Sequence, residues 1–226
     1  MITKFIIVGV IGYLLGSIPF GLLISKQRAK VDIREYGSGK MGATNVLRAA
    51  GTKTAAMVFS LDLMKGALAV IIAGLIIGRE YLVIGGFSLG VLIAQVIAAL
   101  AAMAGHTRSV FLKFRGGGRG VATFFGGLAA LYPPAAIFGG EVFIIGAGLT
   151  KFVSLGSICA AVSTYAILAP LTILNGFPVE YLLYALIGNI VIIIMHRGNI
   201  ARLLAGKERK IGDSAELRGR QTRSME

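Results

Sequence analysis

The sequence has few of the residues that carry metal binding, covalent catalysis or cross-links. Among 226 residues there are one cysteine, two histidines and ten acidic residues. The lone Cys159 excludes a disulfide within the chain. Two histidines without an acidic cluster supply no donor set for a metal, so neither a metal nor another cofactor is expected. The sequence also lacks a serine nucleophile elbow and a plausible triad, which argues against a covalent acyl-enzyme intermediate.

Charged residues are scarce as well. They make up 15% of the chain, against about 25% in an ordinary soluble domain, while hydrophobic residues reach 56%. A soluble globule of this size could not bury such an excess, so the composition predicts an all-α, polytopic membrane protein. The apolar stretch 5–25 is too long for a cleavable signal peptide and is followed by no small-x-small site, so we expect it to remain as a helix.

Seven apolar segments have, or approach, the length of membrane-spanning helices. They are 5–25, 55–78, 82–104, 121–133, 135–149, 152–174 and 180–195. The fourth and fifth are short and are separated by the sequence YPP, so a single interrupted helix, giving six spans, is the alternative. Residues 1–212 are predicted to form one transmembrane domain, and 213–226 a disordered basic tail.

The distribution of lysine and arginine decides between six and seven spans. The linker 26–54 carries seven of these residues, the linker 105–120 carries four, and the chain from 196 onward carries eight. With seven spans all three segments lie on the same side. The positive-inside rule therefore predicts seven spans, an outer N-terminus and a cytoplasmic C-terminus. The net charge of +13 also indicates anionic partners such as phosphates or lipid head groups.

Four polar segments fall on the predicted cytoplasmic face. The first is GSGKMGATNVLRAAG, 37–51, whose glycines, Gly42 among them, permit close backbone approach. Thr44 and Asn45 are predicted N-cap residues of a short helix through Arg48, and such a helix N-terminus can hold a phosphate. The segment is not a P-loop, because Ala-Thr follows Gly42 where Lys-Ser/Thr is required. A turn with a capped helix and no ligand is the alternative.

The second segment is GHTRSVFLKFRGGGRGVAT, 105–123. Its successive glycines, including Gly117 and Gly118, can form an anion-binding nest of backbone amides. Arg115 and Arg119 add charge and can bind phosphate oxygens through two N–H groups. Packing of membrane helices is the alternative role of the glycines.

The third segment is TKFVSLGS, 150–157. Ser154 and Ser157 are three residues apart, so a helix places both hydroxyls on one face near its cytoplasmic end. There they can bind an anion, or they can donate to carbonyl oxygens of their own helix.

The fourth segment is MHRGNIARLLAGKE, 195–208. If it is helical, His196, Asn199 and Arg202 form a stripe that suits phosphate binding or acid–base chemistry. An amphipathic helix on the membrane surface is the alternative.

Two charged residues, Asp62 and Lys65, fall inside the second predicted span. Their spacing allows an ion pair, which would lower the cost of placing charges there. We expect this pair to support the site from below rather than to take part in chemistry.

These segments, together with GSIPFGLLIS in the first span and DLMKG in the second, resemble the bacterial acyl-phosphate glycerol-3-phosphate acyltransferases. The resemblance covers nearly the whole chain. It implies a multi-pass enzyme of phospholipid synthesis in the bacterial inner membrane, with seven spans and a cytoplasmic active site. The implied reaction moves a fatty acyl group from acyl phosphate to glycerol 3-phosphate, giving lysophosphatidic acid and phosphate, without acyl-CoA or acyl carrier protein. We expect a monomer in membrane lipid that binds no nucleic acid.

The resemblance also implies roles for particular residues. Phosphate contacts are expected from Ser38, Gly42, Thr44, Asn45, Arg48, Arg115, Gly117, Gly118, Ser154, Ser157 and Arg202, and catalytic roles from His196, Asn199 and Arg119. The chain departs from the family pattern at three places. Lys40 stands where the first motif usually has Asn, FRGGGRG replaces FKGGKG, and Met195 replaces the Arg that usually precedes the histidine.

Two questions stay open at the level of sequence. The proton of the acceptor hydroxyl goes either to His196 acting as general base or to the donor phosphate itself, and we favour the second version. A transporter of an anionic metabolite and a noncatalytic binder of lipid phosphates are the alternative functions.

Overall fold

The computed structural model describes residues 1–85 and 87–213. The helices found there are α1 (Ile2–Ser17), α2 (Phe20–Ala29), α3 (Ala43–Ile77), α4 (Val91–Thr107), α5 (Val121–Leu131), α6 (Pro133–Thr150), α7 (Val153–Asn175), α8 (Val179–Met195) and α9 (Arg197–Leu204). Shorter elements are the 3-10 helices η1 (Ile33–Glu35) and η2 (Val110–Leu112) and the antiparallel strands β1 (Leu82–Ile84) and β2 (Phe87–Leu89). The predicted tail at 214–226 lies outside the described residues.

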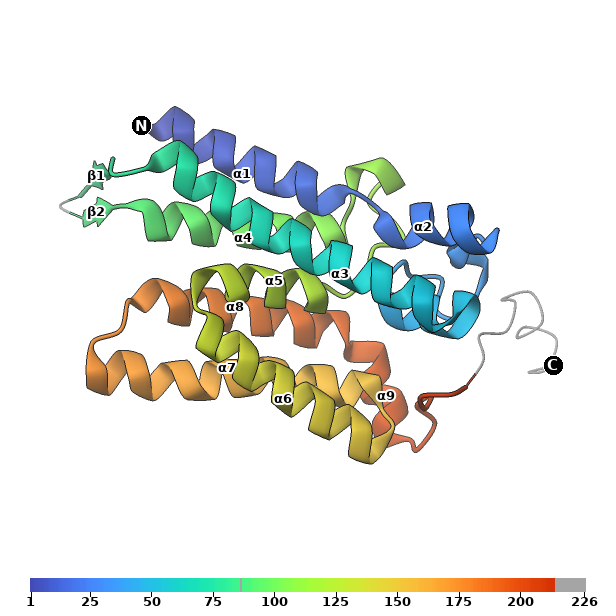
Figure 1. Cartoon of the computed structure of the whole chain (residues 1–226). Coiled ribbons are helices and arrows are strands. Elements are labelled where there is room, and N and C mark those ends of the chain that lie inside the picture. Colours follow the sequence, from blue (N-terminus) through green and yellow to red (C-terminus); the bar gives the residue numbers. More distant parts are fainter. Residues whose placement is uncertain (86, 214–226) are drawn as a thin grey trace.

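The helices pack in two groups (Figure 1). α1, α3 and α4 contact one another, and α5 packs against both α3 and α4 and against α6 and α8 of the second group, in which α7 packs against α6 and α8. The N-terminus and the β-hairpin lie at one end of the molecule, while α2 and α9 lie at the other. We call this second end the loop end. The polar segments meet there, because the N–H of Met41 donates to the carbonyl oxygen of Gly116, and Arg48 contacts the segment after α9.

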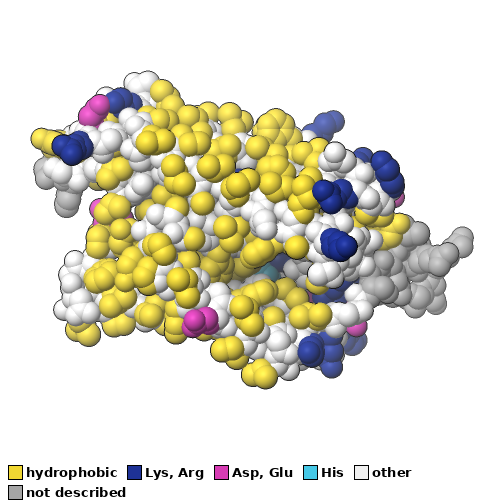
Figure 2. Space-filling view, viewed as in Figure 1, with side chains coloured by type: hydrophobic (Ala, Val, Ile, Leu, Met, Phe, Trp, Pro, Cys, Tyr) yellow, Lys and Arg dark blue, Asp and Glu magenta, His cyan; other side chains and the backbone are white. Residues whose placement is uncertain are grey.

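The surface between the two ends is apolar. Figure 2 shows a broad band of hydrophobic side chains, with many of the Lys and Arg side chains gathered at the loop end. Several large hydrophobic side chains are mostly exposed, among them Leu75, Leu149 and Leu174. Such a surface has no counterpart on a water-soluble monomer and matches the hydrocarbon of a bilayer.

The structure bears on the predicted number of spans. Among the described residues, five helices are long and apolar enough to cross a membrane, or six if α8 and α9, bent by 60°, form one span. α5 is apolar but has 11 residues, about 17 Å of helix, roughly half of a bilayer's hydrocarbon core. The count of seven therefore depends on α5. That count and the orientation of the termini stay predictions.

Several predicted boundaries are wrong, and glycine or proline explains each of them. Residues 82–89 form the β-hairpin with Gly85 at positive φ, so the span predicted from 82 begins at Val91. α3 itself is interrupted by a non-helical backbone at Gly51, which separates the short helix predicted through Arg48 from the span predicted from 55. The stretch 5–25 breaks before Pro19, which cannot donate to the preceding turn.

The turn between α5 and α6 separates two helices, so the alternative of one interrupted helix is wrong. Tyr132 has a non-helical backbone, and Pro133 occupies the first position of α6, where its missing N–H needs no partner. α5 also lies very close to α3, because a Cβ added to Gly126 would collide with the carbonyl oxygen of Leu63. The helix-packing role considered for glycine applies at this position.

Candidate active site

Two adjoining cavities lie where the polar segments meet the helices. The first, which we call the apolar groove, has a volume of about 360 Å³ and runs between α3, α5 and α6. Its apolar lining includes Phe59, Leu63, Phe125, Ile137 and Phe143. The second, which we call the cationic basin, has a volume of about 560 Å³. Seven basic residues and one acidic residue line it: Lys40, Arg48, Arg108, Arg119, Arg197, Arg202, Arg209 and Glu208.

The two cavities meet at a junction formed by Ser38, Lys40 and Arg119, which line both of them. An amphipathic ligand can therefore place an apolar chain in the groove while its polar head lies against cations. A second, water-soluble anion can reach the same junction through the basin. The geometry thus suits a reaction between a lipid-like molecule and a small polar one, both of them anionic.

Arg119 is the most distinctive group at the junction. Its Nε is buried and has no hydrogen-bond partner among the described residues. Burial lowers the pKa of the guanidinium to about 10, and the charges of Arg202 and Arg48 act in the same direction, although Glu208 opposes them. The side chain is still a cation at neutral pH. A buried guanidinium with an unused N–H is a group prepared for an anionic ligand.

The glycines of the loop before α5 serve close packing against α4 rather than an anion-binding nest of free amides. The N–H of Gly118 donates to the carbonyl oxygen of His106 at 3.1 Å, so this amide is not available for the predicted anion nest. A Cβ on Gly118 would collide with Nε2 of His106, and one on Gly117 with the carbonyl oxygen of Thr107. Both glycines are needed because the loop lies directly against the end of α4.

A buried polar cluster supports this loop from below. Lys65 Nζ lies 2.9 Å from Asp62 Oδ1, which confirms the predicted ion pair, and it also donates to the carbonyl oxygen of Ile18 at the break between α1 and α2. Nδ1 of His106 lies 3.4 Å from the same Asp62 oxygen. The cluster thereby connects α3, the α1–α2 break, α4 and the glycine loop. The participation of His106 was not predicted from the sequence.

Asn45 has a different local role from the one predicted. The N-cap of α3 is Gly42, and Thr44 and Asn45 lie in the first turn of the helix. The Asn45 side chain joins four backbone groups of the preceding loop: the N–H of Ser38 and the carbonyl oxygens of Ile33, Tyr36 and Lys40. The prediction that Thr44 and Asn45 cap the helix is therefore wrong. Asn45 holds the loop that brings Ser38 and Lys40 to the junction.

His196 lies at the bend between α8 and α9 and lines the apolar groove. Its Nδ1 lies 2.8 Å from the carbonyl oxygen of Ile192. Because a carbonyl oxygen only accepts, Nδ1 is assigned the hydrogen, and Nε2 of the neutral ring is an acceptor. Burial lowers the pKa of His196 to about 4, and the cations Arg119 and Lys40 contribute to the shift. The imidazole is neutral at pH 7 and can accept a hydrogen bond from a hydroxyl.

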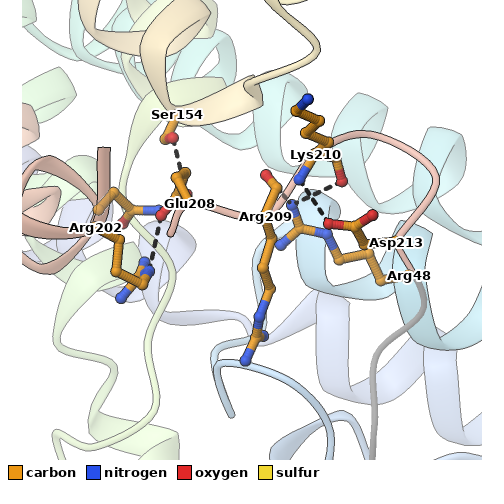
Figure 3. Close-up of polar contacts among 8 residues, drawn as sticks. Arg48, Ser154, Arg202, Glu208, Arg209, Lys210 and Asp213 are labelled. Carbon is orange, nitrogen blue, oxygen red and sulfur yellow. Dashed lines mark hydrogen bonds and ion pairs between the residues drawn. The ribbon is translucent and has the colours of Figure 1, made fainter. Parts of the chain in front are cut away.

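Glu208 organises three of the predicted site residues (Figure 3). Its Oε1 accepts hydrogen bonds from Ser154 Oγ at 2.9 Å and Asn199 Nδ2 at 2.6 Å, and its Oε2 accepts one from Arg202 Nε at 2.8 Å. The carboxylate side chain is only 3% exposed. Glu208 was not predicted as a site residue. The signal that could have indicated it was an acidic residue in an otherwise basic segment.

The segment after α9 is held across the basin by backbone contacts (Figure 3). Arg48 donates from Nη2 to the carbonyl oxygens of Arg209 and Lys210, at 3.1 and 3.4 Å. The N–H of Ile211 donates to the carbonyl oxygen of Lys151 at the α6–α7 turn. Arg48 and the segment after α9 therefore lie together at the basin, and the α6–α7 turn holds that segment in place.

The remaining predicted residues divide into those that reach the cavities and those that do not. The groove is lined by Ser38, Gly42, Thr44, Asn45, Gly118, Arg119, Ser154, Ser157 and His196. The basin is lined by Arg48, Gly117, Asn199 and Arg202, and also by Ser38 and Arg119. Arg115 is exposed and lines neither cavity. Ser157 Oγ donates to the carbonyl oxygen of Val153, as in the alternative considered for it.

The fold and the site together define an integral membrane protein with a cationic junction at the mouth of an apolar groove. The model of the family described as glycerol-3-phosphate acyltransferase matches residues 6–206. The chain belongs to this family.

Individual relatives agree with this assignment along nearly the whole chain. The chain is 61% identical to glycerol-3-phosphate acyltransferase 3 of Dehalococcoides mccartyi strain CBDB1, over 95% of this chain and 99% of that relative. It is 43% identical to the glycerol-3-phosphate acyltransferase of Synechococcus sp. strain JA-3-3Ab, over 89% and 90%. The fold resembles the crystal structure of PlsY, an integral membrane glycerol 3-phosphate acyltransferase, in its glycerol 3-phosphate form. For that pair the TM-score is 0.78 and the identity 37%, over 92% of this chain and 96% of PlsY.

Proposed function

We propose that this protein transfers a fatty acyl group from acyl phosphate to glycerol 3-phosphate, giving lysophosphatidic acid and inorganic phosphate. The observation that carries the proposal is the junction, where the buried Nε–H of Arg119 has no partner in the described part of the chain and lies between an apolar groove and a cationic basin. The groove suits the acyl chain, the basin suits glycerol 3-phosphate, and the phosphate of the donor would lie between them. PlsY, which has been crystallised in glycerol 3-phosphate and lysophosphatidic acid forms, is similar over nearly its whole length.

The reaction depends on positioning of the two reactants and on stabilisation of the leaving phosphate, and it requires no covalent enzyme intermediate. The acceptor hydroxyl oxygen attacks the acyl carbonyl carbon and forms the ester bond, while the bond from that carbon to the phosphate oxygen breaks. The electron pair of the broken bond leaves on phosphate, and the proton of the hydroxyl also leaves. Two bound reactants held at one junction gain from proximity, and the surrounding cations stabilise the charge on the departing phosphate.

Burial and the neighbouring cations lower the pKa of His196 to about 4, so the neutral imidazole is a weak base. This favours the version in which the donor phosphate takes the proton and His196 accepts a hydrogen bond that orients the hydroxyl.

We therefore expect His196→Gln to lower turnover by less than about tenfold and to leave the pH profile of kcat/KM unchanged, whereas loss of a general base costs about 10²–10⁴. Steady-state rates between pH 5.5 and 8 measure this, and the wild type prepared in parallel is the reference. A loss of 100-fold or more, with an altered pH profile, would instead assign the proton to His196.

The groove is proposed to hold the acyl chain of the donor, and Gly140 in the middle of α6 tests this. Gly140 lines the groove, and no described atom lies within 4 Å of a Cβ built there. Leucine at this position should fill the groove while leaving the helix intact. We expect Gly140→Leu to lower kcat/KM for palmitoyl phosphate about tenfold or more, with a smaller loss for octanoyl phosphate.

Gly148→Leu is the matched control for this prediction. Gly148 lies on the same helix with equally open space, but it is exposed and does not line the groove. If both variants change chain-length preference equally, or neither does, the acyl chain does not lie in this groove.

A direct assay tests the proposed function as a whole. Membranes containing the protein are mixed with palmitoyl phosphate and glycerol 3-phosphate, and released phosphate and lysophosphatidic acid are both measured. We expect the two products in equal amounts, and neither without the acceptor. Binding of both ligands without turnover would indicate a noncatalytic binder, and uptake of glycerol 3-phosphate into sealed vesicles a transporter.

The membrane setting is part of the same proposal. We infer a monomer in the bacterial inner membrane with the loop end facing the cytoplasm, because the basic segments are at that end and positive charge favours the cytoplasmic side. The apolar band of the surface suits the bilayer. Proteolysis of right-side-out and inverted vesicles, read with antibodies to each terminus, tests the orientation.

A further inference from the structure

Lys40 lies at the junction of the two cavities. It is one of three residues that line both the apolar groove and the cationic basin. The other two, Ser38 and Arg119, were already expected at the site.

The backbone around Lys40 is held on both sides. Its carbonyl oxygen accepts a hydrogen bond from Asn45 Nδ2 at 3.0 Å, and the N–H of the following Met41 donates to Gly116 of the glycine loop at 3.2 Å. The half-buried Lys40 side chain therefore starts from a fixed position between α3 and the glycine loop. The side chain therefore extends from a fixed base beside both cavities.

The charges that shift the pKa of Lys40 are all of its own sign, although Glu208 and Asp62 each line one of the two cavities. Burial lowers its pKa, and the nearby cations Arg119, Arg197 and Arg108 lower it further. Among the described residues no carboxylate lies within ion-pair distance of Lys40. Arg202, by contrast, is neutralised by Glu208. Cations gathered without a counter-ion in a partly buried site are stabilised when an anion binds.

The position of Lys40 also indicates which of the two reactants it contacts. With an acyl chain in the groove, the phosphate of the donor must lie at the groove mouth, where Lys40 and Arg119 stand. Arg48 and Arg202 line the basin but not the groove, so they suit the phosphate of the acceptor. Lys40 also contributes to lowering the pKa of His196, which places its charge near the group proposed to orient the acceptor hydroxyl.

We propose that Lys40 binds the phosphate of the acyl donor at the groove mouth and stabilises the negative charge that this phosphate gains as it leaves. The inference rests on the proposed function. In the transfer step the acceptor oxygen forms the ester bond, the bond between acyl carbon and phosphate oxygen breaks, and its electron pair goes to phosphate. The hydroxyl proton also goes to the phosphate, and Lys40 keeps its own proton throughout.

The test separates donor from acceptor kinetics in the purified full-length protein. A hydrogen bond between charged groups contributes enough that we expect Lys40→Met to lower kcat/KM for palmitoyl phosphate about 10- to 100-fold. The KM for glycerol 3-phosphate should stay within about twofold, since the basin cations remain. Lys40→Arg keeps the charge and should restore most of the rate. Lys53→Met removes an exposed lysine that lines neither cavity and should behave as wild type.

A second measurement needs no turnover. Palmitoyl phosphate added without acceptor should raise the unfolding midpoint of the wild type and of Lys53→Met, and should raise that of Lys40→Met much less. If the midpoints differ in this way but the wild type transfers no acyl group, binding of the donor phosphate by Lys40 stands and the proposed function fails. If transfer proceeds and Lys40→Met keeps wild-type kinetics with the donor, or loses affinity for glycerol 3-phosphate instead, the inference is overturned.

Discussion

Replacing Arg119 with alanine is expected to lower kcat/KM by about 10²–10³, the cost of removing one preorganised group that stabilises charge in a transition state. Arg119 lines both cavities, and its buried Nε has no partner among the described residues. The loss should therefore appear with both substrates. Because it arises from charge stabilisation rather than from folding, the unfolding midpoint in detergent should change little.

Two further substitutions sharpen this prediction. Arg119→Lys keeps the charge but loses the planar fork of N–H groups, so its activity should lie between those of wild type and Arg119→Ala. Arg115→Ala removes an exposed arginine of the same loop, which lines neither cavity, so a change of about twofold at most is expected. Equal losses in Arg115→Ala and Arg119→Ala would show that the loop binds substrate in another conformation.

The second large effect is expected at Glu208. In Glu208→Gln the amide oxygen can still accept from Ser154 and Asn199, but the amide nitrogen then faces the Nε–H of Arg202, a donor against a donor. Breaking a buried charge pair by removing one partner costs about 3–5 kcal/mol, although the half-exposed Arg202 can recover part of this by turning to water. We expect a lower unfolding midpoint.

The kinetic effect of the Glu208 change should fall on the acceptor. Asn199 and Arg202 line the basin, so their displacement should raise the KM for glycerol 3-phosphate about tenfold or more, with a smaller change for palmitoyl phosphate. Glu35→Gln alters an exposed carboxylate and serves as the control in both measurements. An unchanged midpoint together with unchanged KM for glycerol 3-phosphate would refute an organising role for Glu208.

Local sequence signals predicted much of the chain correctly because they act over short distances. The i,i+3 spacing of Asp62 and Lys65 predicted an ion pair that is present at 2.9 Å. The same kind of reasoning failed at 82–89, where an apolar run was interpreted as the start of a helix. Hydrophobicity alone does not distinguish a short strand from a helix turn, and the chain reversal at Gly85 decided for a hairpin.

Predictions of side-chain roles were less reliable, since each depends on a partner elsewhere in the fold. Asn45 is a good N-cap residue by type, yet its amide is used by four backbone groups of the loop before it. The amide of Gly118 would be free in an isolated glycine loop, but the carbonyl oxygen of His106 takes it. At both positions a contact with a distant part of the chain, or with the preceding loop, takes the group that the local pattern assigned to another role.

The sequence by itself determined that the chain is an apolar helical membrane protein with four polar, mostly basic segments, because composition and periodicity are properties of neighbouring residues. Only the tertiary structure decided that these segments converge on one junction. Glu208 meets Ser154 across 54 positions of the chain, and Arg48 meets Arg209 across 161. Contacts over such separations depend on how the helices pack, and that packing places Lys40 and Arg119 where the groove and the basin join.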